Sequence, residues 1–160
     1  MEATYKTYLS TAIGYLEIVG DEAGIQSVTF VDRLEDPSEL VPEALQDAVI
    51  QLKEYFQKER TQFDLKLAPN GTPFRNEVWT ELQKIPFGKQ ISYQELANRL
   101  GDPKVIRAAA SANGKNPIAI IIPCHRVVGS DGSMVGYASG IHRKKWLLAH
   151  ESPVRQGELF

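Results

Sequence analysis

SYQELANRLGDPKVIRAAASAN, residues 92–113, is the segment of the sequence with the clearest structural pattern. A Ser-X-X-Glu capping box at Ser92 predicts a helix that begins there and stops at Gly101. The Asp102-Pro pair predicts the start of a second helix, which runs to the end of the stretch. Two short helices joined by a tight Gly-Asp-Pro turn indicate a helix-turn-helix, a corner that many helical proteins share.

The second of these helices has one nearly bare surface, because residues 108–112 read Ala-Ala-Ala-Ser-Ala. Such a surface has two interpretations. It can pack closely against another helix, or it can approach the groove of a nucleic acid, with Arg107 projecting from the smooth face. The sequence alone leaves both open.

Outward from this pair, the second half of the chain continues to read as helical. Thr72 and Pro73 supply an N-cap and a first-turn proline, and Phe74, Val78, Leu82 and Ile85 then form an apolar stripe. Residues 141–151 predict a last helix.

The first half of the chain reads differently. Strands are predicted at residues 4–10, 15–19 and 25–31, which would form a small antiparallel sheet. An amphipathic helix is predicted at residues 43–59, and a further short strand at residues 63–67. Ala68-Pro-Asn-Gly71 is the best candidate boundary, so we expect an N-terminal domain of residues 1–71 and a C-terminal domain of residues 72–160.

Charge is divided unevenly between these halves. The whole chain of 160 residues has a net charge of −2, but residues 1–72 hold six Lys and Arg against 13 Asp and Glu, a balance of −7. Residues 73–160 hold 12 against seven, a balance of +5. This division suggests that the second half meets a polyanion, although uneven scatter would produce it equally well.

The apolar content argues for a globular protein outside membranes. The longest apolar stretch, residues 118–123, is far too short to span a bilayer. The N-terminus lacks the basic and apolar regions of a signal peptide, and the chain's one cysteine cannot form an internal disulfide. We therefore expect a cytoplasmic protein.

The candidate chemical centre is Ile120-Ile-Ile-Pro-Cys-His-Arg-Val-Val128, a strand-like run that delivers the lone Cys124. A solitary cysteine is most often a small buried hydrophobe. Here the basic neighbours His125 and Arg126 are expected to lower the pKa of the thiol and favour the thiolate.

This part of the chain resembles the O6-alkylguanine-DNA alkyltransferases, also called methylated-DNA–protein-cysteine methyltransferases. The resemblance rests on Pro-Cys-His-Arg-Val, which is preceded by Asn116-Pro and followed by Gly136-Tyr and Trp146-Leu-Leu-Ala-His-Glu151. The match covers roughly residues 72–151. The resemblance implies an α+β fold (α/β class): a small ribonuclease H-like antiparallel sheet plus helix, followed by a mainly helical, winged helix-turn-helix-like domain.

The resemblance also implies a role for each matching residue. Cys124 corresponds to the alkyl acceptor, His125 to the histidine that takes the thiol proton through a bridging water, and Glu151 to the carboxylate that orients this histidine. Asn116 corresponds to the asparagine that holds the turn around the cysteine, and Tyr93 to the tyrosine that donates to guanine N3.

Further positions are expected to contact DNA and the extruded base. Arg107 corresponds to the arginine that fills the base stack, with Ala108, Ala110 and Ser111 on the groove-facing helix. Family members commonly have glycine after this arginine, so the methyl group of Ala110 could hold the helix farther from the groove. The expected base pocket comprises Tyr93, Val127, Tyr137, Ala138 and Ser139.

The expected activity is direct-reversal DNA repair. A thiolate would displace guanine from the alkyl carbon of O6-alkylguanine, with O4-alkylthymine open as a second substrate. The product is a thioether, which offers water no carbonyl to attack, so each molecule would act once. The target lies inside the duplex and must be flipped out. The expected partner is double-stranded DNA, bound through its minor groove. We expect the protein to be a monomer that does not associate with a membrane, and cooperative binding along DNA is left open.

No cofactor is required by this chemistry, and no metal is expected. Some relatives carry an N-terminal zinc site of Cys and His, but residues 1–72 contain neither residue type. His142 and His150 are interpreted as structural.

Two rival functions remain. Alkyltransferase-like proteins bind the same lesions without repairing them, but they lack the acceptor cysteine that this chain has at Cys124. A cysteine hydrolase built from Cys124, His125 and Glu151 would show multiple turnover.

Overall fold

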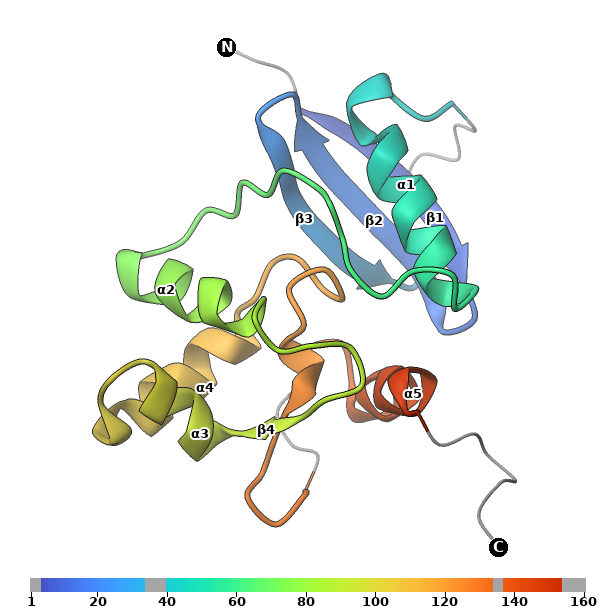
Figure 1. The fold of residues 1–160 in the computed structure, drawn as a ribbon. Helices are drawn as coiled ribbons and strands as arrows, with labels where there is room; N and C mark the ends of the chain where they lie inside the picture. The colour runs from blue at the N-terminus through green and yellow to red at the C-terminus, as the bar shows by residue number, and fades with distance from the viewer. Residues whose placement is uncertain (1–3, 34–39, 134–136, 154–160) are drawn as a thin grey trace, which may run out of the picture. The chain divides into compact units, whose positions relative to one another are not determined.

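The computed structural model describes residues 4–33, 40–133 and 137–153 (Figure 1). Contacts between residues divide the chain into two units. The first comprises residues 1–71 together with Pro117–Ile121, and the second comprises Thr72–Asn116 and Ile122–Phe160. The segment just before the cysteine is therefore grouped with the N-terminal unit, which the sequence does not indicate.

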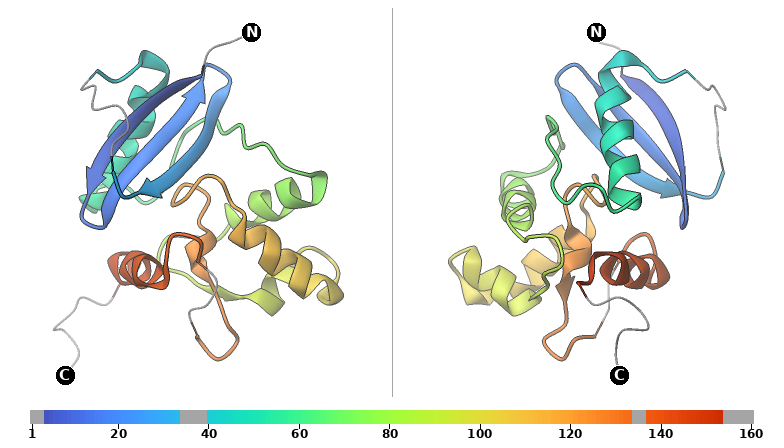
Figure 2. Two further views of the ribbon diagram at one scale, coloured as in Figure 1. Left: turned by 180° about the vertical axis from the view of Figure 1, so that it is seen from behind. Right: turned by 45° about the vertical axis from the view of Figure 1, so that its right-hand side comes forward.

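The first unit is a three-stranded antiparallel sheet with one helix, as predicted. Its strands are β1 (Tyr5–Thr11), β2 (Gly14–Asp21) and β3 (Gly24–Val31), in the order β1-β2-β3. Helix α1 (Glu43–Phe56) lies across one face of this sheet (Figures 1 and 2). Apolar side chains from the two layers form the core between them: Leu9, Leu16, Ile18, Val28, Leu45, Leu52 and Tyr55 are all buried.

Two boundaries in this unit differ from the prediction. Helix α1 ends at Phe56, three residues before the predicted end, and Lys58 adopts a positive φ of 62° that a helix does not tolerate. The predicted strand at residues 63–67 is reduced to one parallel bridge, between Leu67 and Ile25. Alternating hydrophobicity alone does not supply the hydrogen-bonding partner that a strand needs.

The apolar run before the cysteine is also not the strand that the sequence predicts. Only Ile118 pairs with the sheet: Val28 N donates to Pro117 O at 2.9 Å, and Ala119 N donates to Val28 O at 2.9 Å. The chain then turns sharply, with Ile120 at φ 71°. A β-branched residue in this left-handed region is sterically strained, so burial of the isoleucine side chains, rather than extended pairing, accounts for their apolar character.

The second unit is mainly helical. Its elements are α2 (Pro73–Leu82), β4 (Ile91–Ser92), α3 (Tyr93–Arg99), the 3-10 turn η1 (Pro103–Val105), α4 (Ile106–Gly114), the 3-10 turn η2 (Cys124–Arg126), β5 (Val127–Val128) and α5 (Ile141–Glu151).

The predicted caps begin these helices. Thr72 Oγ1 accepts from Arg75 N at 3.2 Å, Ser92 Oγ from Glu95 N at 3.0 Å, and Asp102 Oδ1 from Lys104 N at 2.9 Å. The second helix of the pair starts with a 3-10 turn, so α4 proper begins only at Ile106. Gly101, at φ 95°, follows the end of α3 in a conformation that favours glycine.

Two contacts position the parts of the second unit that matter for chemistry. Strands β4 and β5 are parallel, pairing Ile91 with Val127 and Ser92 with Val128. This pairing ties Tyr93, the first residue of α3, to the segment that follows the cysteine. In the packing of α2 against α4, Trp79 Nε1 donates to Ala112 O at 2.9 Å.

Within residues 4–33, 40–133 and 137–153, no helix combines the length and the apolar character needed to cross a membrane. The same residues contain no group of three or more His, Cys, Asp or Glu arranged to hold a metal ion.

Candidate active site

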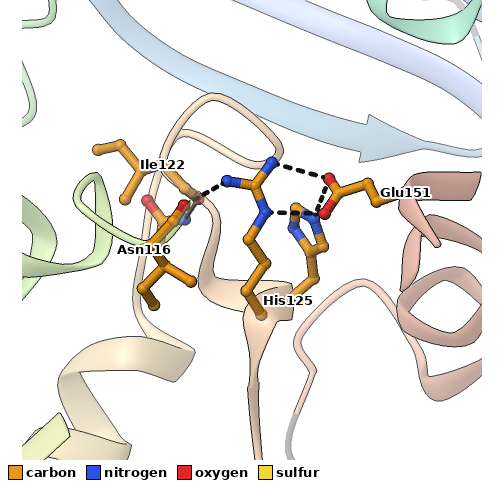
Figure 3. Close-up of polar contacts among 6 residues, drawn as sticks. Asn116, Ile122, His125 and Glu151 are labelled. Carbon is orange, nitrogen blue, oxygen red and sulfur yellow. Dashed lines mark hydrogen bonds and ion pairs between the residues drawn. The ribbon is translucent and has the colours of Figure 1, made fainter. Parts of the chain in front are cut away.

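The cysteine lies in a tight buried turn. Cys124 is 6% exposed and begins η2, and its N donates to Ile122 O at 2.8 Å. Two asparagines brace this turn. Asn116 Nδ2 donates to Ile122 O at 2.7 Å (Figure 3), and Asn113 Nδ2 donates to Cys124 O at 3.3 Å. The turn is therefore fixed on both sides of the sulfur-bearing residue, and Asn113 is a contributor that the sequence analysis did not name.

A buried histidine and carboxylate lie directly beside the cysteine. The Glu151 side chain comes from the end of α5 and meets His125 in the turn, with Nε2 and Oε2 2.7 Å apart (Figure 3). Burial lowers the pKa of His125 more than Glu151 raises it, so the ring is neutral at pH 7. A neutral ring that donates Nε2–H to a carboxylate carries its free lone pair on Nδ1. That Nδ1 is buried and has no hydrogen-bond partner.

Glu151 also holds a buried arginine. Arg126 Nε donates to Glu151 Oε1 at 2.7 Å and Nη2 donates to Oε2 at 2.9 Å, while Nη1 donates to Ile85 O at 2.7 Å. Burial alone would raise the pKa of Glu151, but the hydrogen bonds and charges of His125 and Arg126 outweigh it and hold the pKa far below its ordinary value. The carboxylate is thus a permanent anion between two partners.

The cysteine's electrostatics differ from the sequence-based expectation. Burial raises the pKa of the Cys124 thiol, and a hydrogen bond from Asn116 and the positive charge of Lys144 offset this only in part. The expectation that His125 and Arg126 lower this pKa is wrong. His125 is uncharged, and the charge of Arg126 is directed at Glu151. The sulfur is therefore a thiol that needs a base.

Lys144 on α5 was missed by sequence reasoning. It stands in the run Arg143-Lys-Lys145, which reads as a solvated helix face, yet it is fully buried. Helical spacing contained the signal, because Leu147, Leu148 and Glu151 lie three, four and seven positions further and are also buried.

Two tyrosines lie in the electrostatic field of the cysteine. Tyr93 is half-buried, and burial, followed by the negative charge of Cys124, raises its pKa. Tyr137 is buried and its hydroxyl has no hydrogen-bond partner, and burial raises its pKa well above the ordinary value. Both are protonated at neutral pH and can act only as donors or as uncharged acceptors.

The remaining predicted pocket residues differ in exposure. Val127 is fully buried, Ser139 is half-buried and Ala138 is exposed. Arg143 Nη1 donates to Ser139 O at 3.0 Å, which fixes one end of this loop to α5. Gly136, part of the motif at this loop, lies outside the described residues.

The alanine-rich helix α4 has two different faces. Ala109 and Ala112 are buried, which agrees with the interpretation of close helix packing. Arg107, Ala108 and Ser111 are exposed, and Ala110 is half-buried. Close helix packing is thus confirmed for the buried face. The approach of the exposed face to the groove of a nucleic acid stays a prediction, and Arg107 is the long cation on that face.

The geometry suits one kind of chemistry. The site contains a buried thiol, a neutral imidazole with an unpartnered lone pair, an orienting carboxylate and a protonated phenol. These are the parts of a nucleophilic displacement in which proton transfer accompanies attack and departure.

Comparisons with known proteins match both units. Residues 73–153 match the family described as 6-O-methylguanine DNA methyltransferase, DNA binding domain, and residues 4–69 match 6-O-methylguanine DNA methyltransferase, ribonuclease-like domain.

Individual relatives are similar over nearly their whole length. The methylated-DNA–protein-cysteine methyltransferase of Methanosarcina acetivorans is 43% identical over 152 residues, covering 92% of this chain and 97% of that protein. The structure of the Mycobacterium tuberculosis O6-methylguanine methyltransferase is 38% identical with a TM-score of 0.85, covering 98% of both chains. A structure of M. tuberculosis OGT in complex with DNA is 40% identical with a TM-score of 0.82, covering 95% of both chains.

Proposed function

This chain belongs to the 6-O-methylguanine DNA methyltransferase family, and from that membership we propose which residues carry out its reaction and how. It repairs DNA by direct reversal, passing an alkyl group from damaged DNA to a cysteine of the protein. Cys124 is the acceptor, since the chain has no other cysteine. The observation that carries the proposal is the unpartnered His125 Nδ1, on a ring whose other nitrogen is fixed by Glu151, one residue from that sulfur.

Activation begins with the thiol proton. Because burial raises the pKa of Cys124, the thiolate must be generated at the moment of reaction. His125 Nδ1 takes the proton through one bridging water, since adjacent residues on a 3-10 turn are poorly placed for a direct bond. The imidazolium that forms is stabilised by Glu151, whose low pKa keeps it ionised throughout.

The thiolate then displaces guanine. A bond forms between Cys124 sulfur and the alkyl carbon of O6-alkylguanine, and the bond between that carbon and O6 breaks with its electron pair left on the guanine. Tyr93 donates its hydroxyl proton to guanine N3, neutralising the departing base. The product at Cys124 is a thioether that water cannot hydrolyse, so each molecule acts once.

The outward face of α4 supports binding through the minor groove. That groove is only about 6 Å wide, and a helix with the small exposed residues Ala108 and Ser111 can approach its floor more closely than one with long side chains. Arg107, exposed at the start of α4, fills the space left when the alkylated base rotates out. Tyr137, Ala138 and Ser139 form the loop over the extruded base, with Val127 lining the pocket.

The experiment that tests this proposal is intact mass spectrometry after mixing the protein with a duplex containing O6-methylguanine. One methyl group in place of the thiol hydrogen adds about 14 Da, located on Cys124, and Cys124→Ser should show no addition. Cleavage of many equivalents of an ester or amide with an unmodified mass would instead favour the cysteine hydrolase. Binding without any mass change would favour a pure lesion-binding protein.

A further inference from the structure

The turn that precedes helix α5 is held to that helix by a side chain that the reaction proposed above does not use. Tyr137 is buried, Ala138 is exposed, and Ser139 and Gly140 are half-buried. Gly140 N donates to Tyr137 O at 3.0 Å, which closes these four residues into a turn. Because the proposed function places this turn over the extruded base, its order before DNA arrives affects how readily the base is bound.

Helix α5 begins without the usual side-chain cap. Its N-cap residue is Gly140, whose lack of a side chain leaves the first turn of the helix without a capping oxygen. The backbone of Gly140 adopts φ 102°, a conformation that favours glycine and disfavours the Ser and Thr residues that commonly cap helices. Another contact is therefore needed to fix the junction between the turn and α5.

Arg143 supplies this contact from inside the helix. It is the third residue of α5, and its Nη1 donates to Ser139 O at 3.0 Å, one residue before the N-cap. In a capping box, too, the third helical residue reaches back to the start of the helix, but here a cation donates to a carbonyl. The charge of Arg143 also acts on Tyr137, where it opposes the rise in pKa that burial causes. The guanidinium thus interacts with two of the four residues of the turn.

The position of this arginine in the helix is otherwise unfavourable. The N-terminal end of a helix carries the positive end of the helix dipole and favours anions, yet residues 141–144 read Ile-His-Arg-Lys. Arg143 is half-buried, whereas Lys145, two residues further along α5, is exposed. The hydrogen bond to Ser139 O explains why a cation is stable at this position and why its side chain lies against the turn.

We propose that Arg143 is a positioning residue of the alkyl transfer, which orders the turn of residues 137–140 before DNA binds. The proposal rests on the function proposed above, in which Tyr137, Ala138 and Ser139 cover the extruded base. A turn that is already ordered does not have to lose conformational freedom when the base enters. If the turn were ordered for only a fraction of the time, the apparent affinity for the extruded base would fall by that fraction.

The first test is the rate of methyl transfer. Arg143→Met keeps the apolar stem of the side chain but removes the donor and the charge, whereas Arg143→Lys keeps both. Intact mass, measured at successive times with a duplex containing O6-methylguanine, gives the second-order rate constant. Arg143→Met should lower it about 3- to 10-fold, the range that one hydrogen bond contributes, and Arg143→Lys should recover most of the loss. Lys145→Met removes an exposed cation from the same helix and should match the wild type.

The second test is hydrogen exchange without DNA, which measures the order of the turn directly. In Arg143→Met the backbone amides of residues 137–140 should exchange faster than in the wild type. The amides of α2 and α3 should keep their wild-type rates, because only a local contact is lost. A third measurement, fluorescence anisotropy with undamaged duplex, should give Arg143→Met and Lys145→Met the same affinity, since each variant loses one positive charge.

Three results would overturn the proposal: exchange of residues 137–140 that is the same in Arg143→Met and the wild type, an unchanged rate constant of methyl transfer, or an affinity for undamaged duplex lower in Arg143→Met than in Lys145→Met. The last result would show that Arg143 binds a phosphate instead. Arg143→Met is expected to fold because the side chain is only half-buried, and Arg143→Gln gives a second neutral variant. Failure of the wild type to gain a methyl group would instead overturn the proposed function, and hydrogen exchange would still report on Arg143.

Discussion

The substitution Glu151→Gln tests whether the buried network behind the cysteine is a true charge cluster. Glutamine keeps the shape of the side chain but removes its negative charge. Glu151 accepts three hydrogen bonds, from His125 at 2.7 Å and from Arg126 at 2.7 and 2.9 Å, and its side chain is only 1% exposed. The variant leaves the Arg126 guanidinium, 7% exposed, without its counter-charge.

Removing one partner of a buried ion pair costs about 3–5 kcal/mol of the free energy of unfolding. At about 2–4 °C per kcal/mol for a protein of this size, the unfolding midpoint should fall by about 6–20 °C. Urea denaturation at pH 7 measures the free energy of unfolding, and thermal denaturation measures the midpoint temperature. Tryptophan fluorescence can follow both, because both tryptophans, Trp79 and Trp146, belong to the second unit.

A matched control is Glu95→Gln, which breaks the exposed pair with Arg99 at 3.7 Å on α3. Exposed pairs contribute little, so this loss should stay below about 1 kcal/mol. The double variant Glu151→Gln/Arg126→Met should lose less than the two single variants added together, since neither charge is then stranded. A Glu151→Gln loss as small as that of the control would refute the reasoning.

Three further outcomes are expected. Lowering the pH from about 7 to 4 should reduce the free energy of unfolding. Folding lowers the pKa values of both His125 and Glu151, so the unfolded chain binds more protons than the folded chain in this range. The urea midpoint at each pH measures the loss. Ser111→Leu, on the exposed face of α4, should weaken DNA binding in a fluorescence anisotropy assay with stability unchanged, whereas Ala109→Leu, on the buried face, should cost about 1–3 kcal/mol of stability. Arg107→Ala should weaken binding to a duplex containing O6-methylguanine more than binding to undamaged duplex, because this side chain fills the space left by the extruded base; equal weakening of both in the anisotropy assay would contradict that role.

Local chemistry made much of the fold predictable. The caps at Thr72, Ser92 and Asp102 mark helix starts because a side-chain oxygen satisfies a free backbone N–H, and this needs only neighbouring residues. The apolar run before Cys124 was not predictable in the same way. A buried turn and a buried strand have the same composition, and only the partner at Val28 decides where pairing stops.

In the site, too, features set by neighbouring residues were predictable and features set by tertiary contacts were not. Cys124 and His125 are adjacent in the sequence, and family resemblance identifies them with Glu151 as a candidate set. The electrostatics depend on tertiary contacts, however. The charge of Arg126 is directed at Glu151 on a distant helix, and Lys144, which reads as a surface residue, is the cation that acts on the sulfur. Sequence proximity is thus a poor guide to which charge a group experiences.

The burial of Cys124 also governs how long an unused molecule survives. Peroxides and free electrophiles attack sulfur in its anionic form, and a side chain 6% exposed with an elevated pKa presents little of that form to its surroundings. Because each molecule reacts only once, oxidation or alkylation of Cys124 by another compound would remove that molecule from repair. Burial of the sulfur therefore preserves the fraction of molecules with an unreacted Cys124 until an extruded base enters the site.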